Sequence, residues 1–375
     1  MIIIIDENIA FAKEAFSEFG EIKLVHGRDI TNAALKDAEA LIVRSITKVN
    51  EALLKDTPVK FVGTATIGTD HVDLEYLKSN NITFADAKGC NADAVAEYVF
   101  TSIFYLCVKN NIKLKNKTIG IVGVGNIGSR IERLANAIGL NIIKNDPPLK
   151  RKTGDNSFKE LEEVFDADII TLHVPLNREG KDRTIHLFDE NNLKMLKDRV
   201  IFINASRGQV VDNEALNKII PLKNLLVTLD VWENEPNVNL DLLENVKLAT
   251  PHIAGYSLEG KVNGTTMIYN SFCKFLNIAP KWEPEFPEVE NNLINEPDID
   301  SFEGKLEAVF TKIYNIVNDD KNMREIFKQP PEERGKYFDL LRKNYPLRRE
   351  FINYHLSPSF KDVRLFNILK AFRFR

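Results

Sequence analysis

The chain has 375 residues, more than one ordinary hydrophobic core takes up, so we expect two or three domains. Apolar residues make up 44% and charged residues 28% of it, a balance typical of globular proteins and not of disordered or membrane-embedded ones. A formal net charge of −4 gives no electrostatic reason to expect a nucleic-acid partner.

The first residues predict a buried strand. Four isoleucines lie between Met1 and Asp6, a run too short for a signal peptide or a membrane-spanning helix. The three cysteines, Cys90, Cys107 and Cys273, are odd in number, far apart and without CxxC spacing. This pattern argues against a disulfide framework and against a zinc site. We therefore expect a cytoplasmic protein with no membrane partner and no metal.

Short β-branched runs alternate with helical patterns through most of the chain, which is typical of parallel sheets with crossover helices. Each run of the second series is almost continuously apolar, as expected of strands covered on both faces. The expected fold class is α/β, with two Rossmann-like doubly wound parallel sheets. The runs are 2–5, 21–25, 39–43, 60–64 and 82–84, then 118–123, 140–145, 168–172, 199–205, 224–230 and 246–250.

Two long helical segments set the expected domain boundaries. Residues 91–111 are apolar around most of the helix, which predicts a helix buried between domains. Residues 257–277 have similar character and would return the chain to the first domain. We expect a discontinuous first domain of residues 1–97 plus 256–280 and a second domain of residues 98–255, with a cleft between them.

A change of composition marks the start of the C-terminal part. In residues 279–290 prolines alternate with acids, which predicts an extended linker. Apolar residues then recur at helical spacing from Leu306 to Val317 and predict an amphipathic helix. By its size, the segment 281–375 is expected to form a further small domain of the α+β type.

The run GVGNIG contains Gly123, Gly125 and Gly128 in GxGxxG spacing, directly after a predicted strand and at the start of a predicted helix. Glycines here permit a tight turn and close backbone approach. The helix start, with Asn126 and Ile127, offers free N–H groups to a pyrophosphate. Because glycine-rich turns also serve packing alone, the motif needs support from its surroundings.

Two further residues support a dinucleotide site. Asp146 ends the next predicted strand, where it would accept hydrogen bonds from the adenosine ribose and repel a 2′-phosphate. This favours NAD over NADP. The alternative is a capping acid before Pro147, and the nearby Lys150 and Arg151 keep the cofactor preference open. His173, in a turn after another strand, is interpreted as lining the cofactor site.

Arg207, Glu235 and His252 all follow predicted strands, where an open α/β sheet places its ligands. A histidine can take the hydroxyl proton of a 2-hydroxy acid as hydride leaves, and a carboxylate beside it can hold its tautomer. An arginine can bind the substrate carboxylate. Singly, the three could be a surface cation, a turn acid and a capping histidine, but together they predict 2-hydroxy acid oxidation.

The ordered motifs GVGNIG, LHVPL, NASRGQVVD, DVWENEP and PHIAG resemble those of the D-isomer-specific 2-hydroxyacid dehydrogenases. The resemblance implies that Arg207, Glu235 and His252 are the catalytic triad. It also implies that Asp230 contacts the nicotinamide carboxamide and that Gly255 lies close to the cofactor.

Other features are similar to one branch of that family, namely Tyr256 after PHIAG, the loop that begins at Arg44, and the long C-terminal part. This similarity implies that the substrate is 4-phospho-D-erythronate, oxidised with NAD on the way to pyridoxal 5′-phosphate. Ser45 and Thr66 would contact the substrate, and Tyr256 would approach it from the other side. Arg44 would bind a phosphate or carboxylate, unless it forms an interdomain salt bridge.

The same similarity implies that residues 281–375 are a dimerisation domain and that the protein is a homodimer. A further hypothesis is that the cations of this segment, Arg342, Lys343, Arg348 and Arg349, contribute to a phosphate site across the dimer, with Arg348 and Arg349 as the pair to replace in a test. The apolar anchor of the dimer would consist of Leu340, Leu341, Tyr345 and Phe351.

Two other functions remain open from the sequence. One is oxidation of another 2-hydroxy acid, such as 3-phosphoglycerate or glyoxylate, with the same triad and cofactor. The other is an NAD-sensing binding protein without turnover. A turnover assay separates these alternatives.

Overall fold

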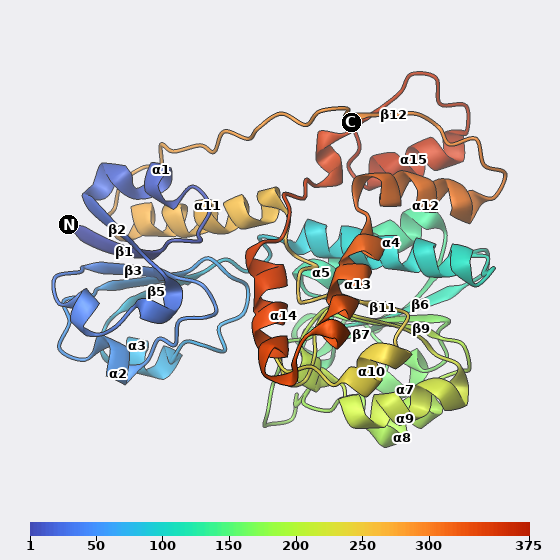
Figure 1. Ribbon diagram of the computed structural model, residues 1–375, viewed down its shortest axis with the longest axis horizontal. Helices are drawn as coiled ribbons and strands as arrows, with labels where there is room; N and C mark the ends of the chain where they lie inside the picture. Colours follow the sequence, from blue (N-terminus) through green and yellow to red (C-terminus); the bar gives the residue numbers. More distant parts are fainter. The chain divides into compact units, whose positions relative to one another are not determined.

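The structure is a computed structural model that describes residues 1–375. The chain forms two compact units, the first from residues 1–91 and 257–288 and the second from residues 92–256 and 289–375. In Figure 1 the blue strands belong to the first unit, and the green strands and the red C-terminal helices belong to the second.

A parallel five-stranded sheet lies at the centre of the first unit. Its strands are β1 (Ile2–Asp6), β2 (Glu21–Val25), β3 (Ala40–Val43), β4 (Phe61–Thr64) and β5 (Thr83–Asp86). The strand order is β2-β1-β3-β4-β5, and Ile3 of β1 lies between Ile22 of β2 and Ala40 of β3. The isoleucine run forms an interior strand of the sheet, between β2 and β3, where both of its faces are buried.

Helices cover both faces of this sheet. Ile3 and Ile5 of β1 pack in one hydrophobic cluster with residues of α1 and α11, and Ile4 packs in another with residues of α2 and α3. This alternation is the period of two expected of a strand. The helices are α1 (Ala12–Phe16), α2 (Glu51–Leu54), α3 (Leu74–Ser79) and α11 (Leu258–Phe275), with short 3-10 turns η1 (Ser17–Phe19), η2 (Gly27–Asp29) and η3 (Ala33–Leu35).

The second unit contains a parallel six-stranded sheet. Its strands are β6 (Thr118–Val122), β7 (Asn141–Asn145), β8 (Ile169–Leu172), β9 (Ile201–Asn204), β10 (Leu226–Leu229) and β11 (Leu248–Ala249). They lie in the order β11-β10-β9-β8-β6-β7. The order reverses between β6 and β8, and ligands of open α/β sheets bind outside the carboxyl ends of the strands at such a switch point.

Helices cover both faces of the second sheet as well. Ile119 and Ile121 of β6 face the cluster that contains α4 and α5, and Val122 faces the cluster that contains α8, α9 and α10. The elements are α4 (Ala92–Lys109), α5 (Asn126–Ile138), α6 (Pro147–Thr153), α7 (Leu161–Val164), α8 (Glu190–Met195), η4 (Gly208–Val210), α9 (Asn213–Lys223) and α10 (Leu240–Asn245).

The C-terminal part packs onto this second unit. Residues 279–290 contain no regular secondary structure, as expected of the linker. The predicted helix from Leu306 to Val317 is instead two helices, because the chain leaves helical geometry at Tyr314 and Asn315 caps the second one. The elements are β12 (Leu293–Ile294), α12 (Phe302–Ile313), α13 (Ile316–Arg324), η5 (Glu325–Lys328), η6 (Pro331–Glu333), α14 (Arg334–Lys343), η7 (Phe351–Asn353), β13 (His355–Leu356) and α15 (Val363–Ala371).

Helix α4 is buried around most of its circumference, and the C-terminal helix α12 supplies one of its neighbours (Figure 1). The rings of Phe104 and Phe310 meet edge to face, with centroids 4.8 Å apart. Phe310 also contacts Phe351, which is fully buried. The expectation that Phe351 anchors a dimer is therefore wrong, because its side chain lies in the core of its own chain.

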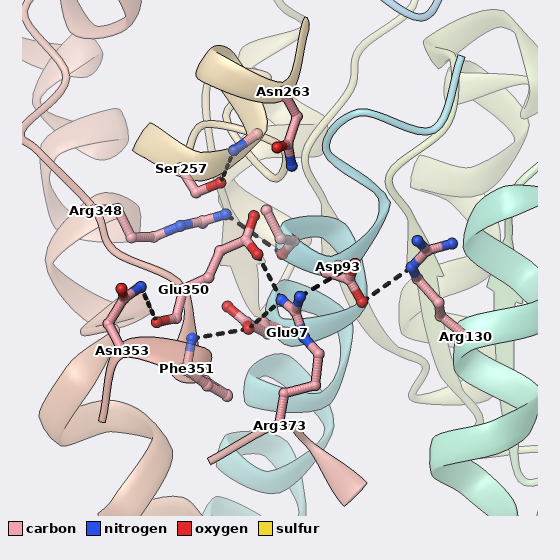
Figure 2. A network of polar contacts seen from close by, with 12 residues as sticks. Asp93, Glu97, Arg130, Ser257, Asn263, Arg348, Glu350, Phe351, Asn353 and Arg373 are labelled. Atoms are coloured by element: carbon pink, nitrogen blue, oxygen red, sulfur yellow. Dashed lines mark hydrogen bonds and ion pairs between the residues drawn. The ribbon is translucent and has the colours of Figure 1, made fainter. Parts of the chain in front are cut away.

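Hydrogen bonds and ion pairs also connect the C-terminal part to α4 (Figure 2). The carboxylate of Glu97, on α4, accepts a hydrogen bond from the backbone N–H of Phe351 at 2.9 Å and lies 3.5 Å from the guanidinium of Arg373. Arg373 also pairs with Glu350. Burial and the nearby charge of Glu350 raise the pKa of Glu97 well above its ordinary value.

Every strand predicted from the sequence is present, and the α/β class with two doubly wound parallel sheets is confirmed. The predicted helices at 91–111 and 257–277 are α4 and α11. The division into three domains stays a prediction. None of the helices combines the length and the apolar character that crossing a membrane requires.

Candidate active site

The glycine turn connects β6 to α5, at the carboxyl end of β6. Gly123 has a φ of +87°, and a Cβ built on it would lie 2.6 Å from the carbonyl oxygen of His173. A Cβ on Gly128 would overlap the carbonyl group of Gly123. Both glycines therefore permit the strand, the turn and the helix to pack closely.

Gly125 has a different role from the other two glycines. A Cβ built on it would meet no protein atom within 4 Å, so packing within the chain does not require a glycine there. The residue precedes the first turn of α5, where the backbone N–H groups of Asn126 and Ile127 have no partners within the helix. Open space beside these donors fits the approach of a pyrophosphate.

Asp146 follows β7 and holds two parts of the turn region together. Its carboxylate accepts hydrogen bonds from the N–H of Val124 at 2.8 Å and from the N–H of Leu149 at 2.9 Å. The capping role considered from the sequence is therefore real. A carboxylate has room for further donors, so a ribose contact stays compatible with it. The two nearby cations pair with acids, Lys150 with Glu160 and Arg151 with Asp182.

His173 lies just beyond β8, next to the glycine turn. Its Nε2 is 2.9 Å from the hydroxyl of Thr171, and its Nδ1 is buried without a hydrogen-bond partner. Burial lowers the pKa of His173 to about 3, so the ring is neutral. An unpaired buried nitrogen beside the turn fits a residue that lines a ligand site.

Arg207 follows β9 and begins the 3-10 turn η4. Its Nη1 donates to the carbonyl of Ser206 at 2.8 Å. A Cβ on the neighbouring Gly208 would overlap the carbonyl of Trp232, so only a glycine lets this loop pack against the segment after β10. The RG glycine thus brings Arg207 close to the segment that carries Glu235.

Asp230 follows β10 and organises the loop that contains the histidine. One of its carboxylate oxygens accepts the hydroxyl of Thr250 and the N–H of Ile253, both at 2.7 Å, and the other accepts the N–H of Ala254 at 3.0 Å. The backbone N–H of His252 donates to the carbonyl of Asp230 at 2.7 Å. The contact with a nicotinamide carboxamide stays a prediction, while the structural role is evident.

Glu235 and His252 form the central pair of the site. The Nδ1 of His252 is 2.8 Å from a carboxylate oxygen of Glu235, and the other oxygen accepts the N–H of Trp232 at 2.9 Å. His252 has a φ of +58°, a left-handed conformation that costs a non-glycine residue about 1–3 kcal/mol. Such strain is typical of functional positions, where the surrounding hydrogen bonds hold it.

The environment keeps Glu235 ionised. Burial raises the pKa of this carboxyl, but the His252 charge and hydrogen bond, the Trp232 N–H and the Arg342 charge outweigh it, so the pKa is lowered overall. An ionised carboxylate at Nδ1 holds the proton on that nitrogen. The Nε2 of His252 is then the atom that can accept a proton from a substrate.

Tyr256 and Gly255 complete the loop after His252. The Tyr256 ring meets Tyr345 of the C-terminal part edge to face, with centroids 5.9 Å apart. The Tyr256 hydroxyl accepts a hydrogen bond from Nη2 of Arg342 at 3.2 Å. Gly255 directly precedes Tyr256 and is partly exposed.

The other predicted substrate residues lie in the first unit. Arg44 donates from Nε to the buried carboxylate of Asp6 at 3.0 Å, so its ion pair lies within that unit and is not interdomain. Ser45 is exposed, and the Thr66 hydroxyl is 2.8 Å from that of Thr64. The roles of Arg44, Ser45 and Thr66 in substrate binding stay predictions.

Arg348 does not fit the hypothesis of a phosphate site across a dimer. It is buried in its own chain, where Nη2 donates to the carbonyls of Ala254 and Ala94, and its guanidinium lies 4.4 Å from the ring centroid of Tyr314. Arg349 is buried too and binds Asn353. The hypothesis is wrong for Arg348, because its guanidinium is buried in its own chain. The sequence shows which residues of this segment are charged, but not which of them fold inward.

Sequence reasoning missed two features of the second unit. Arg342 donates from α14 to the Tyr256 hydroxyl of its own chain, and its charge lowers the pKa of Glu235, whereas the sequence placed it only among the cations of a site across a dimer. His186 forms a second histidine–carboxylate pair, with Glu233 at 2.5 Å. No group of three or more histidine, cysteine, aspartate or glutamate side chains is arranged to hold a metal ion.

Comparisons with known proteins agree with this geometry. Residues 107–254 match the family model described as D-isomer specific 2-hydroxyacid dehydrogenase, NAD binding domain, and residues 287–370 match a domain of unknown function, DUF3410. The erythronate-4-phosphate dehydrogenase of Proteus mirabilis is 44% identical over 94% of this chain and 93% of its own length. That of Serratia proteamaculans is 45% identical over 94% of both chains.

Solved structures show the same fold. The NAD-bound 3-phosphoglycerate dehydrogenase of Entamoeba histolytica has a TM-score of 0.64 and 26% identity, covering 74% of this chain and 95% of its own. The D-lactate dehydrogenase of Aquifex aeolicus, complexed with NAD and lactic acid, has a TM-score of 0.59 and 26% identity over 74% and 96%. The protein therefore belongs to the D-isomer-specific 2-hydroxyacid dehydrogenase family, in its erythronate-4-phosphate dehydrogenase branch, and is an NAD-dependent oxidoreductase.

Proposed function

We propose that this protein oxidises 4-phospho-D-erythronate with NAD to (R)-3-hydroxy-2-oxo-4-phosphooxybutanoate, a step of pyridoxal 5′-phosphate biosynthesis. The observation that carries the proposal is the 2.8 Å hydrogen bond between His252 and Glu235, held in the same unit as the glycine turn. The substrate follows from relatives that are 44–45% identical over nearly the whole chain.

The roles of the protein groups follow from their geometry and chemistry. When bound, NAD supplies the acceptor for the hydride that leaves C2 of the substrate. His252 takes the proton of the C2 hydroxyl at Nε2, and Glu235 stabilises the resulting imidazolium through Nδ1. Arg207 binds the substrate carboxylate and polarises the forming carbonyl. The C2 hydroxyl thus becomes a ketone with one hydride and one proton removed.

The residues of the cofactor site have distinct roles in the same proposal. The N–H groups of Asn126 and Ile127 bind the pyrophosphate in the space left by Gly125. Asp146 binds the adenosine ribose, and Asp230 contacts the nicotinamide carboxamide. His173 and Gly255 line the cofactor, and Arg44, Ser45, Thr66 and Tyr256 bind the substrate.

A turnover assay tests the proposal. NADH formation is followed with 4-phospho-D-erythronate, 3-phosphoglycerate, D-lactate and unphosphorylated D-erythronate, with and without an added 2-oxo acid in case NADH leaves slowly. We expect turnover with 4-phospho-D-erythronate, lost in His252→Asn. His186→Asn is the matched control, because it removes the histidine of the other His–Glu pair and should retain activity.

The outcomes separate the remaining functions. Preference for another acid would keep the dehydrogenase and remove the pyridoxal pathway. Absence of turnover together with tight NAD binding would favour an NAD-sensing protein. Equal loss in His252→Asn and His186→Asn would show that the assay reports folding and not catalysis.

We also propose that the protein is a cytoplasmic homodimer that associates through its C-terminal part. Exposed apolar side chains in that part support the association, notably Leu347, which is 65% exposed. Leu347→Asp should shift the protein from dimer to monomer in light scattering. Leu222→Asp, at a 73% exposed position of α9 outside that part, is the control. A monomeric unmodified protein would refute the proposal.

The exposed apolar side chains of the C-terminal part that could form the dimer contact are Leu293, Ile299, Phe327, Leu340, Leu347 and Val363.

A further inference from the structure

Arg342 brings a cation from the C-terminal part to the catalytic loop of the same chain. It lies in the last turn of α14, and its Nη2 donates to the Tyr256 hydroxyl at 3.2 Å. The guanidinium carbon lies 5.9 Å from the centroid of the Tyr256 ring. Tyr256 is four residues from His252 in the sequence, and the Arg342 charge acts on Glu235, the partner of His252.

The charge of Arg342 is coupled to the catalytic pair. Its positive charge contributes to the lowered pKa of Glu235. Burial would lower the pKa of Arg342 itself, but Tyr256 and Glu235 raise it above its ordinary value. Both effects have the direction expected of a cation held near an anion in a partly buried site.

Arg342 has donor capacity that the protein does not use. Its Nε atom is buried and has no hydrogen-bond partner. Buried N–H groups without partners are rare, and one on a guanidinium at a candidate site points to an acceptor that arrives with a ligand. Arg324, on the neighbouring α13, binds protein acceptors through Nε, Nη1 and Nη2, whereas Arg348 also has a buried Nε and Nη1 without partners. Arg342 differs from Arg348 in its hydrogen bond to Tyr256 and in its charge effect on Glu235.

The packing of α14 and its neighbours holds Arg342 in place. Tyr345, which follows α14, packs against the Tyr256 ring and donates to Asp319 at 2.8 Å. Phe338, one turn before Arg342, is fully buried in the same hydrophobic cluster as residues of β10 and α9. The guanidinium is therefore presented on a rigid element, as a binding residue requires.

We propose that Arg342, together with the hydroxyl of Tyr256, binds the phosphate group of the substrate, so that the C-terminal part completes the active site of its own chain. This inference rests on the function proposed above. Arg207 is reserved for the carboxylate next to the reacting carbon, and a phosphorylated hydroxy acid has a second anion that needs its own cation. The planar fork of Nε and Nη2 matches two phosphate oxygens.

A substrate comparison tests the proposal. We would measure KM and kcat of Arg342→Ala, Arg342→Lys and the control Lys343→Ala with 4-phospho-D-erythronate and with unphosphorylated D-erythronate. Lys343 is exposed on the same helix end, so its replacement removes the same charge without the contact. Arg342→Ala should raise KM for the phosphorylated acid by about 10–100-fold and change kcat/KM for the unphosphorylated acid less than about threefold. Arg342→Lys should recover part of the loss.

A binding measurement keeps the test independent of turnover. Inorganic phosphate should raise the melting temperature of the unmodified protein and of Lys343→Ala, but not that of Arg342→Ala. Equal losses for the two acids, or an unchanged phosphate response in Arg342→Ala, would overturn the proposal and leave Arg342 as a structural support of Tyr256. If the unmodified protein oxidises neither acid, the proposed function fails, and the phosphate response alone decides the role of Arg342.

Discussion

Gly123 and Gly125 lie two residues apart in one turn, but the structure predicts opposite consequences for replacing them with alanine. At Gly123 the added Cβ would lie 2.6 Å from the carbonyl oxygen of His173, well inside ordinary contact distance, and φ is +87°. Overpacking of this kind costs about 1–3 kcal/mol. The left-handed backbone adds roughly 1 kcal/mol for an L-residue.

The two costs together give roughly 2–4 kcal/mol for Gly123→Ala. At about 2–4 °C per kcal/mol for a unit of this size, the melting temperature should fall by roughly 5–15 °C. Gly125→Ala meets no protein atom within 4 Å, so it lacks the overpacking cost, and its melting temperature should fall by less than that of Gly123→Ala even though its φ of −77° and ψ of −145° are less favourable for alanine than for glycine. Its NAD affinity should fall at least about tenfold, or about 1.4 kcal/mol.

Calorimetry without cofactor and titration with NAD measure the two quantities separately. Gly139→Ala serves as a control for left-handed strain alone, because Gly139 has a φ of +90° but no neighbour within 4 Å of its Cβ. If Gly125→Ala binds NAD as tightly as the unmodified protein, the turn is not the pyrophosphate site. A normal melting temperature for Gly123→Ala would refute the packing argument.

Three other predictions follow from the described contacts. Glu235→Gln should lower kcat by about 10²–10³-fold with little change in KM, because the imidazolium that forms at His252 loses the carboxylate that stabilises it. Phe310→Ala should destabilise the second unit by about 3–5 kcal/mol, measured by denaturant unfolding, because it removes a buried ring that packs against Phe104 of α4 and leaves a cavity between α12 and α4. Glu97 has a higher pKa in the folded than in the unfolded chain. Its protonated form therefore contributes stability that is fully present when the pH is below the unfolded-state pKa and is lost as the pH rises through the folded-state pKa. Unfolding free energy should therefore fall toward alkaline pH, and Glu97→Gln should flatten that dependence, whereas an unchanged pH profile in this variant would show that other groups cause it.

Local patterns in the sequence determined much of the fold. Apolar runs of strand length predicted both parallel sheets, because a strand covered on two faces needs apolar side chains at nearly every position. The spacing of Gly123, Gly125 and Gly128 predicted the turn after β6. Only glycine readily adopts the positive φ of Gly123 and leaves room for the close contact between Gly128 and the carbonyl of Gly123. The types of residue at 207, 235 and 252 predicted the chemistry, since each type suits one role.

Residues whose partners lie far away in the chain could not be placed in this way. The sequence did not show which acid pairs with Arg44. The pairing with Asp6 arises because β1 and β3 are neighbours in the folded sheet. In the C-terminal part, charge and apolarity were visible in the sequence, but only the folded chain decided that Arg348 and Phe351 point inward and that Arg342 reaches Tyr256. The composition of a segment records what its side chains can do, whereas their partners depend on the path of the whole backbone, which brings residues from distant positions together.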